Sequence, residues 1–389
     1  MSKTADHVLQ RLEALVGADQ VRTLPPWAPS SQETLEIPIA YPRDEGQARE
    51  LLRLAESDGL HVLPTGAGTK IALEAPRESA HFLIGTEHLC GIIEFEPADG
   101  TLTAWAGTPM RELSQLAAEG GRRVTPQLAH TSATLGGAIA TAQTGDDRLR
   151  YGPLRDQLLG LRALLSAEIS SQSGGRLVKN VAGYDLHRAH CGGRGRFGLI
   201  LEATLRLHPA LGAELHIESE VADLQAGIAL AKRILASTAR PLNVRVVETA
   251  QTILRVHLGG REDVVEDELR TMSAICSSFA PAAPLQFGAP VFRACSLRSQ
   301  AENLAAWSSM IRDGLELETT LVVEPGIASA SLIPSAPIAR RLVSSQLPNI
   351  PQGIDVVLPT EVPTGLSTGV LALQGAVRKA LDPKGLFAN

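Results

Sequence analysis

The chain has 389 residues, with 36 Lys and Arg against 42 Asp and Glu and a formal net charge of −6. Apolar residues make up 44% and aromatic residues 3%, so the core is ordinary but few rings are available to stack on bases. A slightly acidic chain has no general attraction for nucleic acid. The length predicts two or three domains, and we expect no nucleic-acid partner.

The four cysteines (Cys90, Cys191, Cys276 and Cys295) stand far apart, with no Cys-x-x-Cys pair or Cys/His cluster. This spacing predicts neither zinc nor iron–sulfur ligation, so we expect no metal site. The amino-terminal stretch lacks the apolar core of a signal peptide. Because no run of about 18 apolar residues occurs, we expect no transmembrane segment and a cytoplasmic protein with reduced thiols.

The first half of the chain predicts a helix, a linker and a helix that feeds a strand. Residues 6–17 carry an apolar helical stripe, and residues 25–31 have the composition of a linker. Asp44 is the expected N-cap of the next helix, and Gly59 is its expected end. Short strands are then predicted at residues 60–63, 81–84, 91–96, 101–106 and 199–208.

The second half has a different rhythm, β-α-β-β-α, which is typical of a split βαβ unit. Its predicted elements are strand 214–219, helix 223–238, strands 242–247 and 252–258, and helix 262–275. We place a domain boundary near Pro209. The expected organisation is an amino-terminal helix and linker (1–35), a first domain (36–210) and a second domain that includes the closing helix (211–389).

Four segments between residues 64 and 200 could carry chemistry. The first, Pro-Thr-Gly-Ala-Gly-Thr-Lys (64–70), follows a strand, and its glycines let backbone N–H groups converge on an anion. It is neither a Walker loop nor a Gly-x-Gly-x-x-Gly turn that opens a helix. The alternative, a plain strand-to-loop turn, is equally common.

The second segment spans residues 125–145, where Thr131, Ser132 and Thr134 precede a Gly-Gly pair. It suits an anion at a helix start, but taken alone it favours close packing through small residues. The third segment (174–193) places Lys179, Asn180, Tyr184 and Asp185 in an apolar run, and the fourth (194–209) is a glycine loop that leads into a strand. The alternatives for these two are a solvated lysine and a simple glycine turn.

In this order and spacing the four segments resemble the FAD-binding domain of the vanillyl-alcohol-oxidase (PCMH-type) flavoproteins. The closest resemblance is to the FAD-binding E subunit of glycolate oxidase, through Lys-Asn-Val-Ala-Gly-Tyr-Asp-Leu (179–186) and Gly-Arg-Phe-Gly-Leu-Ile (195–200). The resemblance covers about residues 37–210. It extends to the second half only through the strand and helix rhythm and the closing Asp-Pro-Lys-Gly-Leu-Phe (382–387).

The resemblance implies an α+β protein. A PCMH-type FAD-binding domain of two α/β subdomains would be followed by a smaller α+β cap domain with ferredoxin-like split βαβ elements. The family's covalent flavin attachments need a His or Cys in the glycine loop or near position 130. The loop has neither and His130 is a single suggestive residue, so FAD would be bound non-covalently. The implied cofactor-binding residues are Pro64, Thr65, Gly66, Ala67, Gly68, Thr69, Lys70, Pro126, Thr131, Ser132, Thr134, Leu135, Gly136, Gly137, Gly145, Lys179, Tyr184, Asp185, Gly198 and Ile200.

The resemblance also implies a role as the FAD-binding subunit of a glycolate-oxidase-like 2-hydroxy-acid dehydrogenase complex. The substrate would be glycolate or a similar small 2-hydroxy acid, oxidised to the 2-oxo acid. The partners would be a D-type flavoprotein subunit and an iron–sulfur subunit, and any membrane association would be peripheral and through the complex. Two alternatives stay open: a non-catalytic scaffold with this fold, and an independent FAD-dependent alcohol or sugar oxidase.

One departure from the family concerns the histidines. All ten lie at or before His257, so the second half of the cap domain cannot supply a histidine base. Arg293, Arg298 and Glu324 are the nearest substitutes, although a solvated surface position is the commoner interpretation for each. We therefore assign no catalytic residue.

Overall fold

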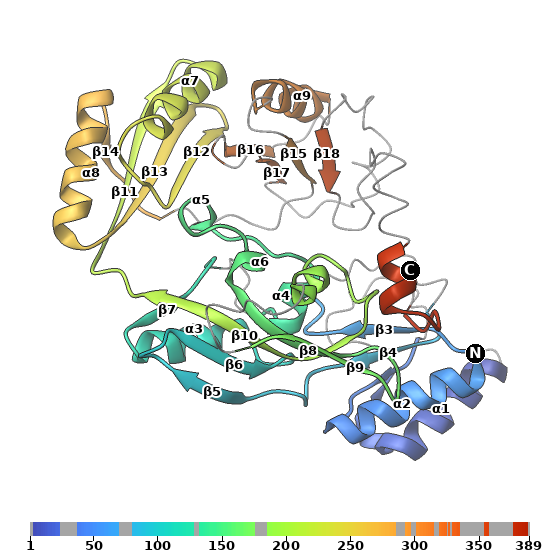
Figure 1. The fold of residues 1–389 in the computed structure, drawn as a ribbon. Helices are drawn as coiled ribbons and strands as arrows, with labels where there is room; N and C mark the ends of the chain where they lie inside the picture. The colour runs from blue at the N-terminus through green and yellow to red at the C-terminus, as the bar shows by residue number, and fades with distance from the viewer. Residues whose placement is uncertain are drawn as a thin grey trace. The chain divides into compact units, whose positions relative to one another are not determined.

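The chain divides into two compact units in the computed structural model (Figure 1). Unit 1 comprises Met1–Gly145, Gly152–Ala210 and Gly369–Asn389, and unit 2 comprises Asp146–Tyr151 and Leu211–Thr368. The structure describes residues 3–23, 37–69, 80–127, 132–175, 185–284, 292–296, 301–314, 319–324, 326, 329–334, 354–357 and 376–387.

Unit 1 contains two sheets and short helices. Its helices are α1 (Lys3–Val16), α2 (Glu45–Asp58), α3 (Met110–Glu119), α4 (Leu135–Ala140) and α6 (Leu154–Gln157), with 3₁₀ turns at Ala18–Gln20 and Leu186–His190. Its strands are β1 (Val21–Arg22), β2 (Ile39–Ala40), β3 (Val62–Thr65), β4 (Phe82–Gly85), β5 (Ile92–Glu96), β6 (Thr101–Trp105), β7 (Arg122–Val124), β8 (Leu158–Leu164), β9 (Ser170–Gly174) and β10 (Leu199–Pro209).

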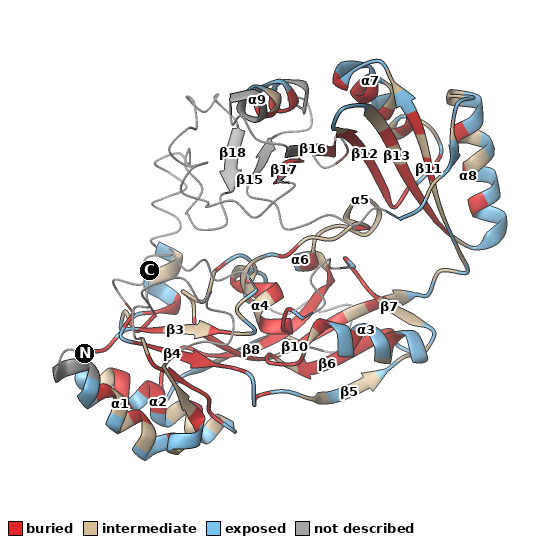
Figure 2. Cartoon of the chain, turned by 180° about the vertical axis from the view of Figure 1, so that it is seen from behind, coloured by how far each residue is buried: buried red, intermediate tan, exposed pale blue. Residues whose placement is uncertain are grey.

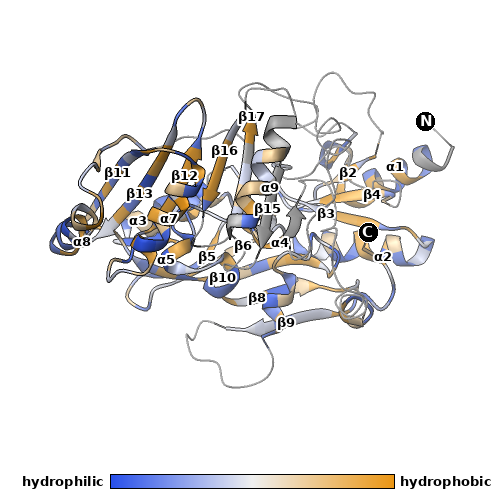
Figure 3. Cartoon of the chain, turned by 90° about the horizontal axis from the view of Figure 1, so that it is seen from above, coloured by the Kyte–Doolittle hydropathy of each residue, from blue (hydrophilic) through white to orange (hydrophobic). Residues whose placement is uncertain are grey.

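The first sheet has the order β1-β2-β4-β3, and β4 runs parallel to both β2 and β3. Helices α1 and α2 bury one stripe each in its core and expose the other, as Figure 2 shows, and β3 and β4 are strongly apolar in Figure 3. The expected helix ends are confirmed. The side chain of Asp44 accepts a hydrogen bond from Gln47 N at 2.8 Å, and Gly59 closes α2 with φ 63°.

The second sheet has the order β5-β6-β10-β8-β9, with β7 paired to the end of β10. All its pairings are antiparallel. Helices α3 and α4 contribute to the same apolar cluster as β6, β8 and β10. The predicted strand 199–208 is therefore confirmed and is a central strand of this sheet. Its central position explains why Ile200 and Thr204 are buried as well as Leu201, Ala203, Leu205 and Leu207 on its other face.

The closing segment packs against unit 1, whereas the sequence analysis assigned it to the second domain. Residues 376–381 are helical, and Val62 N donates to Leu386 O at 2.8 Å, so the segment extends the edge of β3. Phe387 is fully buried in the core of the first sheet. Because β3 is an edge strand with unpaired backbone groups, the closing segment with its apolar Phe387 can extend the sheet there.

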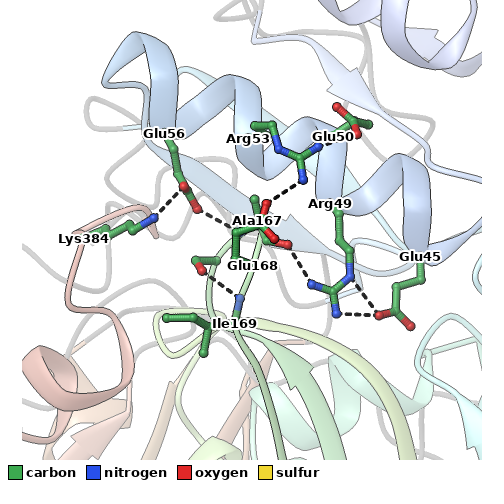
Figure 4. Close-up of polar contacts among 10 residues, drawn as sticks. Glu45, Arg49, Glu50, Arg53, Glu56, Ala167, Glu168, Ile169 and Lys384 are labelled. Atoms are coloured by element: carbon green, nitrogen blue, oxygen red, sulfur yellow. Dashed lines mark hydrogen bonds and ion pairs between the residues drawn. The ribbon is translucent and has the colours of Figure 1, made fainter.

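Glu56 joins the closing segment to two other parts of unit 1 (Figure 4). Its Oε1 accepts from Ala167 N at 2.8 Å, and its Oε2 accepts from Lys384 Nζ at 2.6 Å. In the same row on α2, Arg49 donates to Ala167 O and Arg53 to Glu168, each at 2.7 Å. The α2 helix thus holds both the β8–β9 turn and the chain end through its polar face.

Unit 2 is one antiparallel sheet with the order β14-β11-β13-β12-β16-β17-β15-β18. The order of strands and helices predicted for residues 214–275 is confirmed. The elements of unit 2 are α5 (Arg148–Tyr151), β11 (Ala213–Val221), α7 (Leu224–Leu235), β12 (Asn243–Glu248), β13 (Thr252–Gly260), α8 (Glu262–Ile275), β14 (Ala280–Pro281), β15 (Phe292–Ser296), α9 (Ala301–Gly314), β16 (Thr319–Glu324), β17 (Ser329–Pro334) and β18 (Ile354–Val357).

The three long helices α7, α8 and α9 pack on one face of this sheet around a single apolar core. The other face of the sheet carries pairs of oppositely charged side chains. One of these pairs contains Glu324, which the sequence suggested to be a solvated surface residue. Glu324 is only 8% exposed, accepting from Arg245 Nε and Asn243 Nδ2, both at 3.0 Å. Arg245 also donates to Asp146 Oδ1 at 2.5 Å. The interpretation of Glu324 as a solvated surface residue is therefore wrong.

Candidate cofactor-binding site

The glycine loop lies at the carboxyl end of β3, where Pro64 and Thr65 are the last two strand residues. Thr65 O accepts from Thr86 N at 2.9 Å, which fixes the point where the chain leaves the sheet. Gly68 has φ +71°, a left-handed conformation that glycine adopts without steric cost. Within the described part of the chain, no acceptor bonds to the N–H groups of Ala67, Gly68 and Thr69. Three consecutive free donors of this kind can hold an anion.

Thr134 is pressed against this loop, although the two lie far apart in sequence. A Cβ added to Gly66 would lie 2.1 Å from Thr134 Oγ1, a distance that side chains do not tolerate. Thr134 is also the N-cap of α4, and its Oγ1 accepts from Gly137 N at 3.2 Å. The predicted first and second segments are therefore brought together, and only glycine at position 66 permits the approach.

The backbone N–H groups in the first turn of α4 are hydrogen-bonded within the protein. Leu135 N donates to Thr108 O at 2.9 Å, and Gly136 N donates to Ala106 O at 2.8 Å. A Cβ on Gly136 would lie 2.9 Å from the Cβ of Ala106. The Gly-Gly pair therefore packs α4 closely on the end of β6, as the small-residue alternative anticipated, and any anion is left to the loops that precede the helix.

Gly145 and Pro126 belong to a second tight contact. A Cβ on Gly145 would lie 2.0 Å from the carbonyl oxygen of Gln127, so no side chain fits there. Pro126, which precedes Gln127 directly and follows strand β7, is buried. The contact of Gly145 with Gln127 shapes the backbone here, and nothing in the sequence pattern indicated Gln127 as its partner.

Gly198 and Ile200 lie at the start of β10. Gly198 has φ +130°, and a Cβ there would lie 2.7 Å from Leu164 O. The side chain of Ile200 is 6% exposed and packs in the core of the second sheet. The loop before them reaches the glycine loop, because a Cβ on Gly195 would lie 3.2 Å from Pro64 Cδ. The predicted first and fourth segments are thus neighbours.

The remaining predicted residues divide into two groups. Asp185 is exposed and forms an ion pair with Arg188 Nε at 3.2 Å, and Ser132 is exposed just before Thr134. The other residues, which lie outside the described part of the chain, are Lys70, Thr131, Lys179 and Tyr184.

Sequence reasoning missed Gly107. A Cβ at this glycine would lie 1.8 Å from Thr86 O and 2.8 Å from Leu89 O. Gly107 therefore lets the end of β6 pass beside the end of β4, close to the carbonyls that receive α4. Its position directly after a predicted strand was the only available signal, and many surface turns share that signal.

Burial shifts the pKa values of the two histidines of the 3₁₀ turn Leu186–His190 and of the cysteine that follows it towards their neutral forms. Burial lowers the pKa of His190 to about 4, with a smaller contribution from the charge of His187. Burial raises the pKa of the neighbouring Cys191 thiol to about 11. His187 is also buried, with its Nδ1 3.1 Å from Ser173 Oγ. The turn therefore supplies neither a thiolate nor a histidine cation from these groups near pH 7.

An open cleft of about 580 Å³ lies at the other end of β3, near the end of α2 and the closing segment. Its charged lining residues Arg53, Glu56 and Lys384 are already engaged in the ion pairs of Figure 4. The cleft is therefore separate from the glycine loop.

Comparison with known proteins agrees with this geometry. Residues 38–168 match the family model of the FAD binding domain. An uncharacterized FAD-linked oxidoreductase of Mycobacterium tuberculosis (strain CDC 1551 / Oshkosh) is 26% identical over 252 residues, which are 65% of this chain and 53% of that protein. Glycolate oxidase subunit GlcE of Escherichia coli (strain K12) is 30% identical over 174 residues, 44% of this chain and 49% of that protein.

The fold is shared with a solved structure, that of p-cresol methylhydroxylase with substrate bound. The TM-score is 0.77 at 11% identity, and the match covers 100% of this chain and 96% of that one. The chain spans about half the length of the curated relatives it matches.

The chain therefore contains an FAD binding domain and has the PCMH-type α+β fold. The fold class and the cofactor expected from the sequence are confirmed. The glycine loop fits the cofactor, because its free N–H groups at 67–69 and the side-chain-free approach at Gly66 suit a diphosphate. No helix among the described residues is long and apolar enough to cross a membrane.

Proposed function

We propose that this protein is the FAD-binding subunit of a glycolate-oxidase-like complex that oxidises a small 2-hydroxy acid to the 2-oxo acid. The observation that carries the proposal is the 30% identity to subunit GlcE, within a chain that has the FAD binding domain. The Lys179–Leu186 segment, which resembles the E subunit, supports the same assignment.

In this proposal the glycine loop binds the diphosphate of FAD. The N–H groups of Ala67, Gly68 and Thr69 donate to the phosphate oxygens, and Thr134 holds the loop in place from the opposite side. The remaining residues implied by the family resemblance are proposed to surround the rest of the cofactor, with Gly136, Gly145, Gly198 and Ile200 acting through backbone packing rather than direct contact. FAD is held non-covalently, so denaturation should release it.

The bound flavin would supply the redox chemistry by accepting a hydride from the α-carbon of the 2-hydroxy acid. The described residues of unit 1 bind and orient the cofactor. His187 and His190 are buried and Cys191 is half-buried, and burial keeps all three uncharged near pH 7, so none of them is proposed as a proton acceptor. We assign no proton-accepting residue.

The proposed partners are a D-type flavoprotein subunit and an iron–sulfur subunit. Cys90, Cys191 and Cys276 are free thiols, and no three metal-ligating side chains meet within the described residues. Electrons would accordingly leave through a cluster on another chain.

We also propose a domain boundary near residue 210, with unit 2 as the cap.

The test is purification of the chain alone and together with its proposed partners. We expect a yellow protein whose flavin is released by denaturation, and glycolate or lactate oxidation only in the complex. A colourless chain that cannot be reconstituted with FAD would refute the proposal. Turnover by the isolated chain would instead favour an independent oxidase.

A further inference from the structure

The loop between the 3₁₀ turn and β10 carries two arginines in an unusual backbone setting. Arg194 has φ 52°, a left-handed conformation that costs a residue with a Cβ about 1–2 kcal/mol. Its N–H donates to Ala140 O at 2.8 Å, which ties the loop to the end of α4. Strain of this kind persists where surrounding contacts enforce it, and it is concentrated at ligand sites.

Arg196, two residues later, is a half-buried cation among other cations. Burial lowers the pKa of its guanidinium, and the positive charges of Arg194 and Arg378 lower that pKa further. Within the described residues, no carboxylate lies within ion-pair distance of Arg196. A partly desolvated charge without a counter-ion is unfavourable, so the arrangement calls for an anion from outside the chain.

The third arginine comes from the closing segment. Arg378 lies on the helix of residues 376–381 and donates to Phe387 O at 2.9 Å. This bond fixes its side chain relative to the end that pairs with β3. The fold therefore brings together cations from two segments nearly two hundred residues apart in sequence. Arginines that only kept the surface soluble would not need to be brought together in this way.

The loop that carries Arg194 and Arg196 lies next to the end of β3. Between the two arginines of the loop stands Gly195, where an added Cβ would lie 3.2 Å from Pro64 Cδ. Pro64 directly precedes the glycine loop with its free N–H groups. Guanidinium groups that reach these backbone donors would complete a site for phosphate oxygens, because arginine binds them through a planar pair of N–H groups.

We propose that Arg196, flanked by Arg194 and Arg378, binds a phosphate group of the ligand held by the glycine loop. The inference deepens the proposed function and rests on it for the identity of the ligand. The same chemistry has two sources, the diphosphate of FAD and a separate phosphate-bearing small molecule. Neither the glycine motifs nor the family resemblance assigns these arginines a role.

The test measures binding to the full chain stripped of flavin. Dissociation constants for FAD, for riboflavin (which has no phosphate) and for inorganic pyrophosphate are compared among the natural chain, R196Q, R378Q and R111Q. Arg111 is an exposed residue of α3 in the same unit, so its variant controls for the loss of one positive charge. We expect R196Q to weaken FAD and pyrophosphate binding by about tenfold, R378Q to weaken both less, and R111Q to change neither.

The three ligands distinguish the two possible sources of the phosphate group and show which proposal has failed. Loss of FAD affinity with riboflavin affinity unchanged assigns the site to the FAD diphosphate. Loss of pyrophosphate binding alone supports the anion site and assigns it to a separate phosphate ligand. Unchanged FAD and pyrophosphate binding in R196Q, or equal weakening of FAD and riboflavin, would overturn the inference. If the natural chain binds no FAD, the proposed function fails, while pyrophosphate still tests the arginines.

Discussion

Gly66 and Thr134 are so close that a Cβ on Gly66 would lie 2.1 Å from Thr134 Oγ1. The contact brings the glycine loop after β3 against the N-cap of α4. Two segments that the sequence presents separately therefore become one candidate site, and a single methyl group at position 66 should separate them.

The first prediction is that Gly66→Ala abolishes FAD retention. The added Cβ must displace either the loop or Thr134, and displacement of Thr134 also costs α4 its cap, about 1 kcal/mol. The flavin content of the purified variant measures the effect. Gly212→Ala is the matched control, because a Cβ there meets its nearest atom at an ordinary 3.5 Å. Full flavin content in Gly66→Ala would contradict this site geometry.

The second prediction is that Ala142→Gly stabilises the protein. Ala142 follows α4 in a left-handed conformation with φ 46° and is exposed. Glycine adopts this conformation without the Cβ penalty, so we expect a gain of about 1 kcal/mol in the free energy of unfolding. Calorimetry should show a higher Tm, and a lower one would show that the strain is absent.

The third prediction concerns the chain end. Phe387 is fully buried beside Val62 of β3, so Phe387→Ala should cost about 3–5 kcal/mol in the stability of unit 1. Because β3 leads into the glycine loop, flavin should also be released at a lower temperature. Lys379→Ala, at an exposed position of the same closing segment, is the control. Equal Tm values for the two variants would refute the docking of this segment.

The fourth prediction concerns the buried charges of unit 2. Although burial itself lowers the pKa of Arg245, Glu324 and Asp146 raise it above its ordinary value. Arg245→Met leaves Glu324 buried without its ion pair and should cost about 3–5 kcal/mol. Arg270→Met, at a largely exposed ion pair on α8, should cost less than about 1 kcal/mol.

A double variant tests the same pair from the other side. Arg245→Met combined with Glu324→Met removes both charges, so much of the lost stability should return. The four free energies of unfolding form a double-mutant cycle. Additive effects of the two substitutions would show that Arg245 and Glu324 do not stabilise one another.

The fifth prediction is a pH dependence from His190. Its folded pKa is about 4 against an ordinary value of 6.5, so the unfolded chain binds more protons between these values. The contribution of His190 to stability is therefore fully present above pH 6.5 and falls as the pH drops towards 4, at up to about 1.36 kcal/mol per pH unit. His190→Gln should flatten this slope in unfolding experiments.

The control for the pH experiment is His7→Gln, because His7 is exposed on α1. That substitution should leave the slope between pH 4 and 6.5 as it is in the natural chain. An unchanged slope in His190→Gln would show that His190 is not buried as a neutral ring.

The sequence by itself determined the local elements. Asp44 and Gly59 set the ends of α2, and the ranges of α7, α8 and β10 could be predicted, because each depends on neighbours within a few residues. The glycine motifs in their order also indicated the FAD binding domain, since backbone approach to a diphosphate restricts residue choice at the loop itself.

Only the tertiary structure decided which distant segments meet. The contact of Gly66 with Thr134, the docking of Phe387 on β3 and the burial of Glu324 all join residues more than sixty positions apart. The spacing of apolar residues along the sequence does not indicate such contacts, because they depend on how sheets and loops pack. The same packing brings the loop of Arg194 and Arg196 to Pro64, and brings Arg378 to the residue that pairs with Val62. Composition alone could not indicate that these arginines come to the same strand.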